Sequence, residues 1–207
     1  MPSPLIARLA LLATALVFAI LASSAYLRLS AAAGDCAFRP ECATRSVPSL
    51  ARTIARAAHR LSASVVAVVV LLIAALGWLR REAGQETRWL ALALIVLTAF
   101  LAVLGAAARD SYAPAVTLGN VIAGNAMAAI GWWLYLRNRS ASPAPRHGRA
   151  LLAGCAVTAF AISLALAAPA ASGAVASLSM GMTLSIAATL TLLASVWFFA
   201  RLASAPR

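Results

Sequence analysis

Two cysteines and one histidine are the side chains of this sequence with the clearest chemical potential. Cys36 and Cys42 enclose the short segment CAFRPEC. If this segment faces an oxidising compartment, we expect the two cysteines to form a disulfide. That disulfide has two interpretations: a structural staple that closes a short loop, or a redox-active pair that accepts electrons. Cys155 lies inside an apolar run and is expected to be a small apolar filler.

His59 stands just before an apolar run expected from about residue 61 to residue 79, so its ring should lie near the edge of the apolar core. An imidazole there suits heme iron or another metal. The alternatives are a histidine wetted by lipid headgroups and a buried, hydrogen-bonded one. Arg52, Arg56 and Arg60 follow at i, i+4 and i+8, one stripe beside His59 if the helix extends outward. Such a stripe suits heme propionates or anionic lipid.

Asn120 and Asn125 are costly polar residues inside another apolar run. Interhelical hydrogen bonding is the default role for them, and contact with a ligand or cofactor is the alternative. The apolar runs contain no acidic residue, which argues against a proton-coupled transporter.

The composition of the chain indicates whether these residues lie in a water-soluble protein or in a membrane protein. The chain has 207 residues, of which 63% are hydrophobic and 11% charged, whereas soluble domains carry about 25% charged residues. Every basic residue is an arginine, and the net charge of +12 is spread between the apolar runs rather than gathered in one patch. Such arginines mark topology and contact headgroups. A soluble enzyme, a disordered protein and a nucleic-acid binder are therefore excluded in favour of a protein of the lipid bilayer.

The sequence predicts an all-α, polytopic membrane helix bundle with six transmembrane helices, because six runs approach the roughly 20 apolar residues that a span needs. They cover about residues 9–26, 61–79, 89–108, 113–136, 150–168 and 174–200. The first run has a rival interpretation as a signal peptide that is cleaved in the small-residue segment ASSA at residues 22–25.

Arginines and tryptophans predict the orientation. If the N-terminus is cytoplasmic, Arg109 is the only arginine in the short outer loops. The long loop between the first two spans then faces outward. The cytoplasmic side then holds Arg8, Arg80, Arg81, Arg88, Arg137, Arg139, Arg146, Arg149, Arg201 and Arg207. All five tryptophans fall at the same side, where amphipathic rings suit the headgroup layer. We therefore expect a multi-pass protein of a bacterial-type inner (plasma) membrane, with both termini cytoplasmic.

Several short motifs, in this order, resemble those of the heme A synthase family. The family has a C-P-D-W-P-x-C segment after its first helix, and the two cysteines and Pro40 match it. The segment Ala58-His59-Arg60 is similar to the family's E-x-x-H-R helix. Further similarities are Arg28-Leu29-Ser30, Leu104-Gly105, Pro114 and Val116-Thr117-Leu118. The chain thus resembles a half-length, degenerate member, matched over about residues 1–136.

The resemblance implies a four-helix core over residues 1–136. The apolar runs and the arginine pattern add a cytoplasmic linker over 137–148 and two additional transmembrane helices over 149–207. Family members oxidise the methyl group of heme O to the formyl group of heme A for cytochrome oxidase, at histidine-ligated hemes near the outer face. By resemblance, His59 is the iron ligand of a heme of b, O or A type. Arg56, Arg60 and Asn120 are then the expected heme contacts.

Three departures from the family pattern bear on activity. Arg56 replaces the acidic residue three positions before the histidine, and Gly119, followed by Asn120, occupies the fourth-helix histidine position. The second half lacks both of its histidines, and His147 belongs to the cytoplasmic segment. Either the chain supplies one ligand in a homo-oligomer or with an oxidase or heme-pathway membrane protein, or it is a non-catalytic accessory or assembly subunit of a terminal oxidase. A quinone-linked thiol oxidoreductase is the remaining alternative.

We predict that Cys36 and Cys42 are joined in the resting protein. Closing so short a loop stabilises the outer segment by about 2–3 kcal/mol in the chain-entropy model. Alkylation of the denatured protein without reductant should label Cys155 alone, and all three cysteines after reduction. Labelling of Cys36 and Cys42 before reduction would contradict the pairing.

Overall fold

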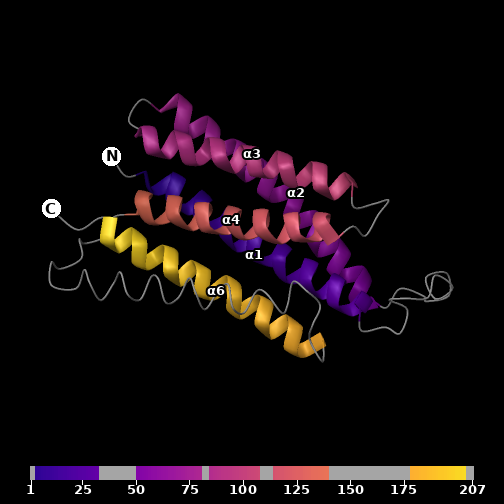
Figure 1. Ribbon diagram of the computed structural model, residues 1–207. Coiled ribbons are helices and arrows are strands. Elements are labelled where there is room, and N and C mark those ends of the chain that lie inside the picture. The colour runs from indigo at the N-terminus through magenta and orange to yellow at the C-terminus, as the bar shows by residue number, and fades with distance from the viewer. Residues whose placement is uncertain (1–2, 33–49, 81–83, 108–113, 140–177, 204–207) are drawn as a thin grey trace.

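The computed structural model describes residues 3–32, 50–80, 84–107, 114–139 and 178–203, and their regular structure is entirely helical. The helices are α1 (Pro4–Ala32), α2 (Leu50–Leu79), α3 (Gln85–Ala107), α4 (Pro114–Asn138) and α6 (Leu178–Ala203) (Figure 1). The predicted all-helical class is confirmed. Within the described residues, three segments are long and apolar enough to cross a membrane, namely Pro4–Leu27, Leu50–Leu79 and Gln85–Ala106, so the number of six spans stays a prediction. The expected span over residues 150–168 lies outside the described residues.

Local sequence signals explain where the helices begin. Ser3 precedes Pro4 and its carbonyl accepts the first helical hydrogen bond of α1, from the amide of Ala7 at 3.0 Å. A serine followed by proline at the first helical position is a favourable start. Helix α2 begins at Leu50 rather than near residue 61, because the intervening residues contain no glycine or proline and are rich in alanine and arginine. His59 therefore lies well inside a helix instead of at its start.

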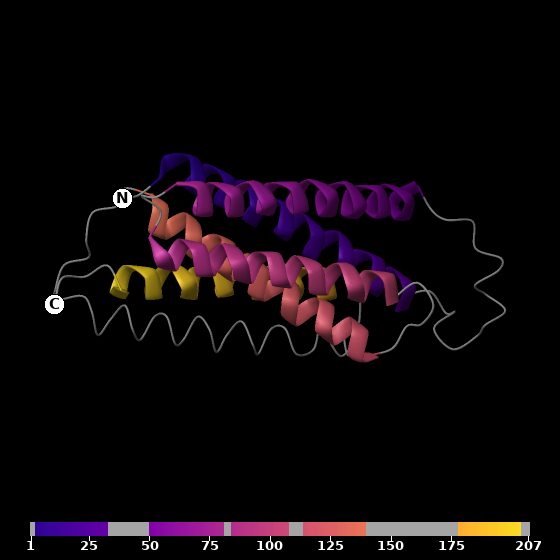
Figure 2. The same ribbon diagram turned by 90° about the horizontal axis from the view of Figure 1, so that it is seen from above.

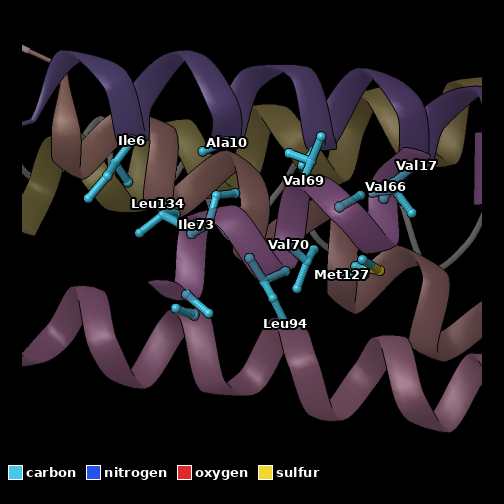
Figure 3. Packing of buried hydrophobic residues seen from close by; sticks show 14 residues of the cluster. Ile6, Ala10, Val17, Val66, Val69, Val70, Ile73, Leu94, Met127 and Leu134 are labelled. Atoms are coloured by element: carbon cyan, nitrogen blue, oxygen red, sulfur yellow. The ribbon is translucent and has the colours of Figure 1, made fainter. Parts of the chain in front are cut away.

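Four helices form a ring in which α1 packs against α2, α2 against α3, α3 against α4 and α4 against α1. Within the described helices, α2 and α4 lie on one diagonal of this ring and α1 and α3 on the other. Helix α6 lies outside the ring, against α1 and α4 (Figures 1 and 2). Figure 3 shows the ring's interior, where Ile6, Ile73, Leu94 and Leu134 are almost completely buried. Helix α1 is thus an integral part of the packed core.

Glycines of α4 allow α1 to approach closely. A Cβ atom on Gly131 would lie 2.8 Å from Thr14 Oγ1, and one on Gly124 would lie 2.7 Å from Leu21 Cδ2. Thr14 is buried, and its hydroxyl donates to the Ala10 carbonyl at 2.8 Å, which fixes the side chain that faces Gly131. Small residues at helix contacts are a common means of association in lipid. These contacts also fix the antiparallel register of α1 against α4.

One end of the bundle carries arginines in or directly after α1, α2, α3 and α4, and we call it the arginine-rich end; Arg52, Arg56 and Arg60 lie toward the other end of α2. There Arg80 Nη1 donates to Ser3 Oγ at 3.4 Å, and the Ser3 amide donates to Asn138 Oδ1 at 3.4 Å. Glu86 accepts hydrogen bonds from Trp133 Nε1, at 3.0 Å, and from Arg137, with which it forms an ion pair. The start of α1, the end of α2, the start of α3 and the end of α4 therefore meet at one end, as the arginine pattern predicts.

We predict that Gly131→Ala destabilises the bundle relative to the matched variant Gly105→Ala. Both changes gain the same helix propensity of up to about 1 kcal/mol. A Cβ on Gly105 meets nothing within 4 Å, whereas one on Gly131 displaces Thr14 or separates α1 from α4. The difference between the two variants should be about 1–3 kcal/mol, measured by unfolding in detergent followed by circular dichroism. Equal stability of the two variants would contradict the close approach.

Candidate functional site

His59 contacts α1 near the end of the bundle opposite the arginine-rich end, which we call the His59 end. Its Nδ1 lies 3.4 Å from Ser23 Oγ. The Ser23 hydroxyl also bonds within α1, to the carbonyls of Ala19 at 2.8 Å and Ile20 at 3.1 Å. The ring is half-buried between the two helices. The histidine side chain therefore lies in the contact between α1 and α2, rather than at the end of a helix.

His59 lies on the same face of α2 as the buried core residues of that helix. Val66, Val70 and Ile73 are buried in the core and recur at helical spacing. His59 lies one step before Val66 on the same face, since residues seven apart nearly superimpose in a helix. It thus continues the stripe of side chains that faces the interior of the ring. A polar, ligating group at the end of an apolar stripe is suited to holding a buried ligand.

Asn120 occupies the equivalent place on α4. Met127 and Leu134 are buried in the core, and Asn120 precedes Met127 by the same helical step. The register fixed by Gly131 on Thr14 and Gly124 on Leu21 places Asn120 level with Ala25 of α1. That is about 3 Å along the axis from Ser23, which contacts His59. His59 and Asn120 therefore lie at the same depth, on the inner faces of the two diagonal helices.

The two asparagines of α4 have different environments. The Asn125 amide group donates to the Val121 carbonyl at 2.8 Å, and its Oδ1 accepts from Thr189 of α6 at 3.3 Å. Asn125 thus has the interhelical hydrogen-bonding role that is the default for such residues. Within the described residues, the carboxamide of Asn120 makes no hydrogen bond to protein, although the residue is half-buried. A polar side chain in such a place gains from a bound partner.

The three arginines Arg52, Arg56 and Arg60 of α2 differ in how exposed their side chains are. Steps of four residues advance about 40° around a helix, so the stripe turns away from the interior along its length. Arg52 is half-buried and lies on the face of His59, whereas Arg56 and Arg60 are exposed. A group bound inside the ring would therefore meet Arg52 first, and one reaching past α2 would meet Arg56 or Arg60.

Two of the predicted site residues, Cys36 and Cys42, lie outside the described residues, as does His147. Among the residues that the structure describes, no group of three or more histidine, cysteine or acidic side chains could hold a metal ion. The sequence analysis missed Ser23 as a partner of His59. A small polar residue at matching depth in the neighbouring antiparallel helix was the available signal.

No known protein family, curated protein or solved structure matched the chain in the comparisons made.

Proposed function

We propose that the chain is a heme A synthase-like integral membrane protein that acts in heme A supply for cytochrome oxidase assembly. The proposal places a heme with one histidine ligand inside the four-helix ring at the His59 end. The observation that carries it is the placement of His59 and Asn120 at one depth on the facing sides of α2 and α4. It adds to the resemblance that the sequence motifs suggest.

The residues fit a heme with a single axial ligand. His59 has its Nδ1 beside Ser23 Oγ. A neutral imidazole with one nitrogen held and the other available is the usual form of a ligating histidine. Asn120 would supply a polar group rather than a strong iron ligand, so His59 would be the ligand that the described part of the chain offers. A bound heme would supply the capacity for oxidation, while the chain would bind and orient it.

Proposed contacts follow from the same geometry. Arg56 and Arg60 are the propionate partners that guanidinium chemistry and their place beside His59 suggest, and their exposure suits propionates directed toward the membrane surface. Arg52 lies on the face of His59 and is the further candidate. Guanidinium groups pair with carboxylates bidentately, which would orient the macrocycle as well as hold it.

The second candidate is a non-catalytic accessory or assembly subunit of a terminal oxidase. It is favoured by Arg56 in the place of an acidic residue and by Gly119 and Asn120 in the place of a histidine. Under this alternative the ring is a docking or heme-holding scaffold, and no oxidation occurs on it. The two candidates differ in whether the purified chain converts heme O.

We predict that His59→Ala abolishes heme retention while membrane insertion is preserved. The loss should be at least about tenfold in heme per chain, because removal of the only ligand exceeds the effect of removing a supporting group. Absorption spectra and heme extraction after purification in mild detergent measure it. The control is His147→Ala, which removes the chain's other histidine and should retain heme. A heme-free wild type from heme-replete cells, or full retention in His59→Ala, would overturn the heme site in favour of the accessory role.

We further predict that the arginine-rich end faces the cytoplasm, since arginine is retained on that side during insertion. Reporter fusions after Arg139 and after Arg207 should both report a cytoplasmic location. An insertion into the segment at residues 33–49 should report the outer side and serves as the internal control. A periplasmic signal from either of the first two fusions would reverse or break the proposed topology.

A further inference from the structure

We propose that Ser23 is a positioning residue for His59: it accepts a hydrogen bond from Nδ1–H and thereby makes Nε2 the nitrogen with a free lone pair. The contact of α1 with α2 would then determine which nitrogen can bind a ligand. That the ligand is heme iron rests on the proposed function. The tautomer itself does not, because it is a property of the chain without heme.

The Ser23 hydroxyl has one proton, and α1 already uses it. Ser23 Oγ lies 2.8 Å from the Ala19 carbonyl oxygen and 3.1 Å from the Ile20 carbonyl oxygen. Both oxygens only accept, so the hydroxyl donates to them, as serines inside helices commonly do. What remains for His59 Nδ1, at 3.4 Å, is a lone pair of Oγ. A lone pair on oxygen attracts Nδ1 only if Nδ1 carries a proton.

The opposite tautomer is disfavoured by the same atoms. With the proton on Nε2, the lone pairs of Nδ1 and Ser23 Oγ would face each other, unless the hydroxyl left the carbonyls of α1. The contact of Ser23 Oγ with Nδ1 therefore favours the tautomer with the proton on Nδ1.

Fixing the proton on Nδ1 has a consequence for ligand binding. A ligating histidine normally donates its other N–H to an oxygen, which sets the tautomer and the ring orientation. Loss of such a partner typically weakens metal binding 10–100-fold. Ser23 belongs to α1, whose register is fixed by Gly124 and Gly131 of α4. The contacts between α1 and α4 therefore help to set where Ser23 meets His59 of α2.

The test is ¹⁵N NMR of the full chain with labelled histidine, purified without heme supply at about pH 8, where ordinary histidines are neutral. The substitution His147→Gln leaves His59 as the only histidine signal. In this background we compare Ser23→Ala and Ser23→Thr. The control Ser64→Ala removes a hydroxyl from an exposed position of α2, where it donates only to its own helix at Arg60.

We expect Nδ1 to be protonated in the parent protein, in Ser23→Thr and in Ser64→Ala, and Ser23→Ala to show a mixture of tautomers. Heme binding should then fall 10–100-fold in Ser23→Ala only. Protonated Nε2 in the parent protein, or an unchanged tautomer in Ser23→Ala, would overturn the assignment of Ser23. A parent protein with protonated Nδ1 that binds no heme would support this assignment and contradict the proposed function instead.

Discussion

In a bilayer, helices gain little from burying apolar side chains against one another, because lipid is equally apolar. The approach of α1 to α4 at Gly124 and Gly131 therefore depends on contact between backbones and small side chains. This contact fixes how far one helix slides along the other. If α1 shifted by one helical turn along α4, residues that now face each other would move apart by about 5 Å. Each contact between these helices would then be lost.

The proposed site depends on that register because its residues come from three helices. His59 belongs to α2, Ser23 to α1 and Asn120 to α4, and only the close packing of α1 brings the last two to the depth of the first. Polar groups anchor the bundle at its arginine-rich end, where Ser3 bonds both to Arg80 and to Asn138. The exposed ion pair of Glu86 and Arg137 contributes less than about 1 kcal/mol to this anchoring.

Much of the fold could be predicted from apolar run length, because a membrane requires spans of a set size. The extension of α2 back to Leu50 could not, since its first turns are too polar to count as apolar. Nor could the helix faces be assigned. In spans of alanine, leucine and valine the lipid-facing and buried sides have similar composition. The sequence therefore does not distinguish Asn120, on the inner face of α4, from Asn125, which bonds to α6. Ser23 was missed because its role arises from packing between helices, not from a local motif.

The spin state of the purified wild-type protein tests the central claim most directly. If His59 ligates heme iron as proposed and no second strong ligand is present, the ferric heme should be five-coordinate or carry water. Electron paramagnetic resonance of protein that contains about one heme per chain should then show a high-spin signal. A predominantly low-spin signal from two strong protein ligands, or protein without heme, would contradict a single-histidine heme site at the end of this bundle.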